Sequence, residues 1–375
     1  MNDDVFDLIE QAAREGGANS ALDLLVTISL RDKNYPLLFE ARLMQARHRI
    51  GLPLIFNAPL DDLPEDQRRA YEEAMREAAR ETGSLFLAEG EILRAWPYFR
   101  AIGNPAPVAA AIEKIDAHDQ LDGIIELAFG QAVHPRKGFE LLLKTHGICR
   151  AITLFGQYPD PKTRDQCAVI LMRALHAELV DNLKHAILRT EGREPEGSSV
   201  TELISGRDWL FGAFGSYVDP AHLTAVIPLA LDFTDPDALR LALELCHYGA
   251  HLSSDFQYRS APPFEHFYND HAVFLKALAG YETDAAVAHF RKKVADSEAA
   301  DTGPAQVLVM LLTRLKRYRE AIEVSLDHLG DHNQNQLPCP TIPELCQLAG
   351  DYDSLREVAR DRRDMLNFTA AAIGT

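Results

Sequence analysis

The sequence lacks the features that would place the protein in or across a membrane. No uninterrupted run of about 18 apolar residues occurs, which is the length that a membrane-spanning helix needs. The first residues, MNDDVFDLIEQ, are acidic and have neither the basic start nor the apolar stretch of a secretory signal. The five cysteines are scattered, odd in number and form no CxxC pair, which disfavours a disulfide framework and a zinc ribbon. We therefore expect a cytoplasmic protein without membrane association.

Several signatures of catalysis and of nucleotide binding are also missing. The chain has no G-x-G-x-x-G after a strand, no G-x-x-x-x-G-K-[ST], no G-x-S-x-G and no H-E-x-x-H. It also lacks a basic patch, since 56 acidic side chains outnumber 38 basic ones and leave a formal net charge of −18. Phosphate backbones would be repelled by this charge, so we expect no nucleic-acid partner.

Strand signals are nearly absent, whereas helical periodicity is widespread. The periodicity predicts helices over 21–30, 140–156, 168–188, 222–233 and 305–315. Three Asp-Pro pairs predict helix starts, because Asp accepts hydrogen bonds at the N-cap and proline suits the first helical position; they are Asp160-Pro161, Asp219-Pro220 and Asp235-Pro236. The predicted fold class is all-α.

Three segments share one pattern in which a polar turn ends in tyrosine. They are RDKNYPLLFEAR (31–42), LKRYREAIEVSL (315–326) and AGDYDSLREVAR (349–360). Three positions after each tyrosine stands a small or apolar residue, namely Leu38, Ala321 and Leu355, and five positions after it stands Glu. The last two tyrosines are 34 residues apart. This pattern resembles the turn between the two helices of a tetratricopeptide-type repeat, clearly over 300–365 and more weakly over 18–50.

The resemblance implies an α-solenoid of antiparallel helix pairs that wind into a right-handed superhelix. We expect a single array over 1–375, with tetratricopeptide-like helices at 1–50, a divergent helical middle at 66–300 and tetratricopeptide-like repeats at 301–375. Within the middle, 88–115 has the same helix–turn–helix rhythm without the tyrosine pattern.

Histidines and aromatic residues are concentrated in HYGAHLSSDFQYRSAPPFEHFYNDH (247–271). In the helix before and within this stretch, a second, polar stripe is formed by Arg240, Glu244, His247 and His251. His247 and His251, four residues apart, have the spacing of a metal-ligand pair, with Glu244 or Asp255 as a carboxylate ligand for zinc, iron or manganese. The favoured interpretation is a solvated or groove-lining face without a cofactor, and the metal site is the alternative.

The rest of the stretch predicts a loop and a second helix. The loop carries Asp255, Tyr258 and Arg259, residue types that bind partners when a rigid scaffold holds them. The helix is expected to start near Pro262-Pro263, with Ser260 as its cap. His271 falls in the apolar stripe and is expected in the core, whereas His266 and Asp270 are expected to form a surface pair.

Two weaker constellations lie elsewhere in the chain. His146 and Cys149 are three residues apart, but a nucleophilic thiolate needs a base within reach, and a buried inert cysteine is the expectation. Glu178, Asp181 and His185 follow one helical face, as carboxylates of di-metal bundles do, and would need a partner such as the Glu244–His247 pair. GRDWLFGAFGSY (206–217) is expected to be a tight junction between helices.

The favoured function is a non-catalytic interaction scaffold that binds a peptide or a partner protein in a concave helical groove formed in part by residues 247–271. The acidic total favours a basic or neutral partner. The alternative is a metal-dependent enzyme or metal-binding protein that uses His247 and His251. A third option is a cap or dimerisation module for another enzyme, and a homodimer is compatible with either binding role.

Overall fold

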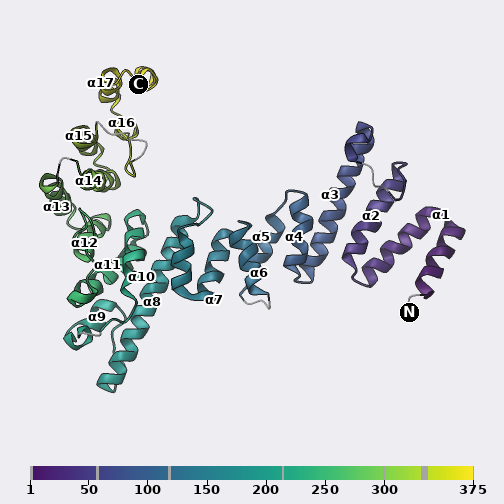
Figure 1. Cartoon of the computed structure of the whole chain (residues 1–375), viewed down its shortest axis with the longest axis horizontal. Coiled ribbons are helices and arrows are strands. Elements are labelled where there is room, and N and C mark those ends of the chain that lie inside the picture. The colour runs from purple at the N-terminus through teal and green to yellow at the C-terminus, as the bar shows by residue number, and fades with distance from the viewer. Residues whose placement is uncertain are drawn as a thin grey trace. The chain divides into compact units, whose positions relative to one another are not determined.

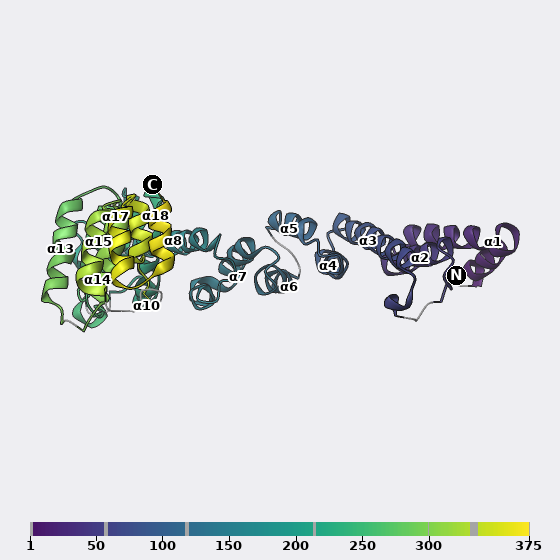
Figure 2. The same cartoon turned by 90° about the horizontal axis from the view of Figure 1, so that it is seen from above.

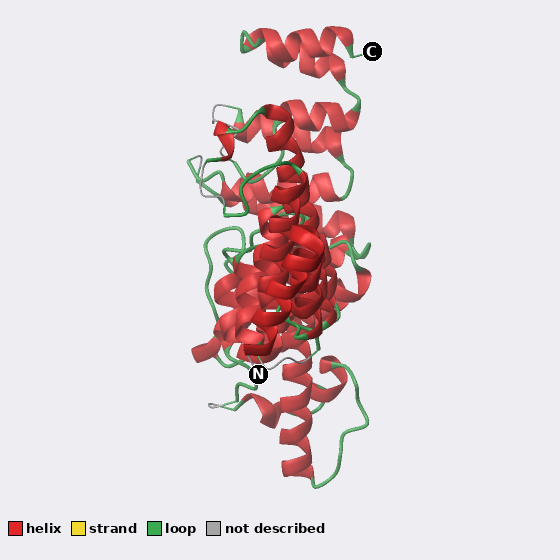
Figure 3. Cartoon of the chain, turned by 90° about the vertical axis from the view of Figure 1, so that its right-hand side faces the viewer, coloured by secondary structure: helices red, strands yellow, loops and turns green. Residues whose placement is uncertain are grey.

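The computed structural model describes residues 3–55, 59–116, 120–212, 215–298, 300–330 and 337–374. Over these ranges all regular elements are helical and no strand occurs (Figure 1; Figure 3). The predicted all-α class is thus confirmed. In the same ranges no helix is both long and apolar enough to cross a bilayer.

The chain forms two compact units, Met1–Gly147 with Gln157–Thr163, and Ile148–Gly156 with Arg164–Thr375. Unit 1 contains α1 (Asp3–Arg31), α2 (Tyr35–Arg49), η1 (Leu60–Asp62), α3 (Glu65–Ala88), α4 (Ile92–Ala101), α5 (Ala106–Glu113), α6 (Leu121–Ile125), the π-helical η2 (Glu126–Gly130) and the first part of α7 (Pro135–Phe155). Two of these helices are broken by glycine, because Gly17 and Gly147 adopt φ values of 72° and 76°. The break in α7 coincides with the end of the first segment of unit 1.

After the last part of α7, unit 2 continues with α8 (Arg164–Glu191), the longest unbroken helix in the described ranges. There follow α9 (Val200–Ile204), η3 (Asp208–Phe211), α10 (Pro220–Val226), η4 (Ile227–Asp232), α11 (Pro236–His251), η5 (Ser254–Phe256), α12 (Phe267–Leu278), α13 (Thr283–Asp296), α14 (Gly303–Arg314), α15 (Tyr318–Leu329), α16 (Ile342–Ala349), α17 (Tyr352–Asp361) and α18 (Met365–Ile373). From α11 onward each α-helix packs on the next one along the chain (Figure 1; Figure 2).

The three tyrosines of the sequence pattern, Tyr35, Tyr318 and Tyr352, are the first residues of α2, α15 and α17. The residues three positions later are buried and the glutamates five positions later are exposed. Each preceding turn is closed by a backbone bond from residue i to the carbonyl of i−5; the pairs are Asn34 to Ser29, Arg317 to Leu312 and Asp351 to Cys346, at 2.8, 2.8 and 2.9 Å. In each of these turns one helix ends in a residue with left-handed backbone angles, and the next helix begins directly after the turn.

The same turn recurs in the middle of the chain, where the sequence showed no tyrosine pattern. The bonds run from Glu91 to Phe86, from Asn104 to Phe99 and from Tyr281 to Lys276. The residue before each donor is Gly90, Gly103 or Gly280, with φ values of 79°, 64° and 85°. One kind of turn therefore connects helices in both units, and the fold is a helical repeat. The right-handed superhelix and the single array over 1–375 stay predictions.

Two predicted helix starts are correct and two are wrong. Asp219 and Asp235 cap α10 and α11 by accepting backbone bonds. Asp160 caps no helix, because its carboxylate accepts bonds from Lys162 N and the Thr163 hydroxyl in a turn, and α8 begins only at Arg164. The helix expected from Pro262 begins at Phe267, with His266 rather than Ser260 at its N-cap.

Candidate functional site

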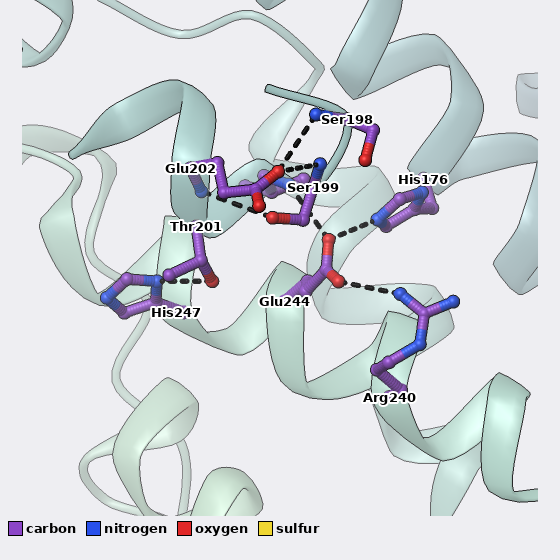
Figure 4. A network of polar contacts seen from close by, with 9 residues as sticks. His176, Ser198, Ser199, Thr201, Glu202, Arg240, Glu244 and His247 are labelled. Carbon is purple, nitrogen blue, oxygen red and sulfur yellow. Dashed lines mark hydrogen bonds and ion pairs between the residues drawn. The ribbon is translucent and has the colours of Figure 1, made fainter. Parts of the chain in front are cut away.

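The predicted polar stripe of α11 is centred on Glu244, which is only 8% exposed. Its Oε2 accepts bonds from His176 Nε2 (2.8 Å) in α8 and from the backbone N of Val200 (2.9 Å) in α9 (Figure 4). Its Oε1 accepts a bond from Arg240 (2.8 Å), one turn earlier in α11. Glu244 thus joins three helices and is not part of a solvated face, which corrects the expectation from the sequence.

Burial alone would raise the pKa of Glu244. The bonds from His176 and Val200 and the charges of His176 and Arg240 outweigh burial, so the pKa lies below its ordinary value. The carboxylate is therefore ionised and fully engaged at neutral pH. Such a group holds helices together and is not a poised acid or base.

A capping box at the start of α9 fixes the position of Val200, whose backbone N–H bonds Glu244. The Ser199 hydroxyl accepts from Glu202 N (3.2 Å), and the Glu202 carboxylate accepts from the backbone N of Ser198 (2.9 Å) and Ser199 (3.1 Å) (Figure 4). These backbone bonds lower the pKa of Glu202. The S-S-V-T-E sequence at 198–202 carried this signal, because Ser three residues before Glu is typical of the motif.

His247 and His251 follow on the same face of α11. The half-buried His247 forms a hydrogen bond between its Nδ1 atom and the Thr201 hydroxyl (3.2 Å). The pKa of His247 is lowered, mainly by burial and to a smaller extent by the charge of His251. The exposed His251 donates from Nδ1 to the His247 carbonyl (2.8 Å), and the two ring centroids are 4.7 Å apart. The two imidazole rings are neighbours on one face of α11, and both Nδ1 atoms are engaged in hydrogen bonds.

No further protein ligand for a metal lies beside the His247–His251 pair in the part of the chain that the structure describes. In the described ranges no three His, Cys, Asp or Glu side chains are arranged to hold a metal ion. Both oxygens of Glu244 are occupied, and Asp255 is exposed in η5. Zinc, iron or manganese bound to the histidine pair would need ligands from a partner or from solvent.

Four aromatic side chains belong to the C-terminal end of α11 or to the two segments that pack on it, and we call them the aromatic surface: Trp209 and Phe211 in η3, His251 in α11, and Tyr258 in the loop after η5. Phe211 packs on His251 with a centroid distance of 5.3 Å, and on the buried Tyr248 at 5.8 Å. Trp209 is 42% exposed and Tyr258 is 50% exposed.

The loop that carries Tyr258 is fastened to the end of α11. The Gln257 side chain donates to the carbonyls of Gly249 (3.1 Å) and Leu252 (2.8 Å), and Tyr258 itself packs on Phe267 with centroids 5.4 Å apart. Arg259 follows it as an exposed side chain. The sequence singled out Tyr258 and His251 but treated 206–217 as a junction only, and so missed Trp209 and Phe211.

The predicted surface pair His266–Asp270 is wrong. Asp270 is 1% exposed, and its carboxylate accepts from the backbone N of His266, from His289 Nε2 and from Lys293 Nζ. The partners lie 19 and 23 residues further along the chain, in α13. His271 is 2% exposed between Phe264 and Phe267, which confirms its predicted place in the core.

The two weaker constellations do not form catalytic groups. Cys149 is exposed instead of buried, and the break at Gly147 lies between it and His146, whose ring bonds Asp122 (3.1 Å). The second constellation, Glu178 with its neighbours on α8, was expected to need Glu244 of α11 as a partner. Glu178 is exposed, and the residue of α8 that contacts Glu244 is His176.

Comparisons with known proteins identify no family. No family model and no curated protein matches the chain. Among solved structures, a "Circular tandem repeat protein with novel repeat topology and enhanced subunit contact surfaces" matches with 16% identity, covering 99% of this chain and 67% of that one, at a TM-score of 0.17. This likeness is too low to carry an argument about fold or function.

Proposed function

We propose that the chain is a tetratricopeptide-like α-solenoid of antiparallel helix pairs, wound as a right-handed superhelix, and that it acts as a non-catalytic interaction scaffold. It binds a peptide or a partner protein in a groove to which the aromatic surface contributes. The observation that carries this proposal is the exposure of two large aromatics, Trp209 and Tyr258, in the two segments that pack on the end of α11 through Phe211 and Gln257. Tryptophan and tyrosine are enriched among the residues that dominate binding energy at interfaces.

The surroundings of the aromatic surface support binding more than catalysis. The carboxylate of Glu244 on α11 is occupied by bonds that fix α8, α9 and α11 to one another, and that of Glu202 is occupied by the N-terminal cap of α9. A surface held in this way loses little conformational entropy when a partner docks. The net charge of −18 favours a basic or neutral partner and accelerates the approach of a basic one.

The test is selection of binding peptides from a random display library on the full-length chain, followed by affinity measurements with variants. We expect Trp209→Ala and Tyr258→Ala to weaken the selected peptides about tenfold or more. Tyr281→Ala is the matched control, because Tyr281 is also exposed (66%) but lies in the turn between α12 and α13. Equal affinities for all three variants, or a library that yields no binder, would contradict the proposal.

A further inference from the structure

A second polar centre of unit 2 lies between the start of α12 and α13, and the proposed scaffold function does not use it. Buried Asp270 accepts bonds from His289 Nε2 (2.9 Å) and from Lys293 Nζ (2.8 Å). Glu265 also accepts from the same Lys293 Nζ. Burial would lower the pKa of Lys293, but the two carboxylates outweigh it and raise that pKa. One ammonium group therefore serves two carboxylates, so among Asp270, Glu265 and Lys293 the negative charges outnumber the positive one, and the His289 ring adds a further hydrogen bond to Asp270.

This centre forms part of the wall of a cavity of about 300 Å³. Ligand pockets for small molecules start at about this size. The charged and titratable residues that line it are Glu265, His266, His289, Lys292, Lys293 and Asp296.

At the edge of the cavity two opposite charges remain unpaired. Lys292 and Asp296 are exposed and four residues apart on α13. No ion pair in the described ranges involves either of them. Lys before an acid at this spacing is the weaker of the two orders for a helical ion pair, so both side chains remain available to a ligand.

We propose that this cavity binds a small zwitterion that carries both an ammonium and a carboxylate group, such as a free amino acid. The ammonium group meets Asp296 and Glu265, and the carboxylate meets Lys292. A simple anion would face the surplus negative charge of the Asp270–Glu265–Lys293 centre, and a simple cation would face Lys292. Only a ligand that carries both charges can pair with Lys292 and with the carboxylates at the same time.

Two further cavities of unit 2 support no such proposal. The one of about 450 Å³ is lined by Arg207 and Glu202, which are already occupied by Glu191 and by the cap of α9. The one of about 220 Å³ shares Glu194 and Pro195 with it and has a single basic side chain, Lys184, besides His185. Neither is backed by a buried charge centre like that of Asp270.

The experiment is calorimetric titration of the full-length chain with α-, β- and γ-amino acids, and with butylamine and butyrate as probes that carry one charge each. We expect at least one amino acid to bind and neither single-charge probe to do so. Lys292→Ala and Asp296→Asn should each weaken that binding about tenfold or more, because each removes one charge-assisted bond. Lys292→Arg should restore most of the affinity.

Two exposed residues elsewhere in unit 2 provide matched controls, Lys276→Ala in α12 and Asp327→Asn in α15. Both should bind like the unmodified chain. The proposal is overturned if no amino acid binds at millimolar concentration, if butylamine or butyrate binds equally well, or if the control variants weaken binding as much as the cavity variants. The substituted side chains are exposed, and a circular dichroism spectrum of each variant verifies that it is folded.

Discussion

At the scale of single residues, the buried titratable groups of unit 2 determine how its stability depends on pH. His271 stacks on Phe264 with a centroid distance of 4.1 Å and donates from Nδ1 to the Phe267 carbonyl (2.7 Å). Burial lowers its pKa to about 4. The native state therefore keeps His271 neutral where the unfolded chain already binds a proton.

The His271 pKa predicts a loss of stability on mild acidification. Because the folded pKa is lower than the unfolded value, this contribution is present above about pH 6.5 and is lost as the pH falls towards 4. Between about pH 7 and pH 5 the free energy of unfolding should fall by about 2 kcal/mol more in the unmodified chain than in His271→Phe. Urea denaturation at the two pH values measures this difference. Parallel pH dependence in the two chains would show that His271 is protonated in the folded state.

A second prediction concerns the bonds of Glu244. Glu244→Ala should lower the free energy of unfolding by about 3 kcal/mol, because it leaves the buried N–H of Val200 unsatisfied and removes the partner of His176. Arg240→Ala removes only the mostly exposed partner and should cost less than about 1 kcal/mol. Chemical denaturation distinguishes the two, with Glu323→Gln on the exposed face of α15 as control. A cost for Arg240→Ala equal to that of Glu244→Ala would refute the assigned roles.

The burial of a residue could be predicted from the sequence where the pattern of its own helix determines it, as for His271 in its apolar stripe. Glu244 and Asp270 could not, because their partners are 68, 44, 23 and 19 residues away. An acid on a polar stripe has the same pattern in sequence whether it meets water or a neighbouring helix. Only the packing of helices distinguishes a solvated carboxylate from a buried one.

At the scale of elements, a close approach between α11 and α12 depends on the absence of one side chain. A Cβ at Gly249 would lie 2.2 Å from the ring of Tyr268, which is buried. Gly249→Ala should therefore destabilise unit 2 by about 2 kcal/mol, since the ring has to move within a packed core. Gly156→Ala is the control, because there the added atom meets only the Thr153 carbonyl at 3.8 Å. Equal midpoints in urea for both variants would mean that the two helices do not pack as described.

The helix connections show which local signals sequence reasoning can and cannot use. The tyrosine pattern found three of the recurrent turns because a bulky side chain marked them. The turns at Gly90, Gly103 and Gly280 have the same backbone bond but different side chains. What they share is one left-handed residue, which glycine supplies most easily and which Lys33 and Lys316 also adopt. The turn requires a backbone conformation and not a particular side chain. A search for one residue type in the sequence therefore finds only some of these turns.

At the scale of the whole molecule, the helices make most of their contacts with neighbours in sequence. The buried apolar cluster that contains Phe274, Phe290 and Leu312 is confined to residues 274–371. A separate cluster in unit 1 contains Leu43 and Tyr71. In arrays of this kind each helix pair is stabilised by its own folding and by its immediate neighbours, so stability is a local property.

Because packing is local, we expect a destabilising substitution in one unit to lower the stability of that unit only. Phe290→Ala empties a fully buried position of α13 and should cost about 3–5 kcal/mol. Native-state hydrogen exchange should then show lower protection in α12–α15 and unchanged protection in α2–α4. Phe99→Ala in α4, which is equally buried, should produce the reverse pattern. If either variant reduced protection evenly from α2 to α17, the two units would unfold as one cooperative body, and the contacts within each unit would not by themselves account for its stability.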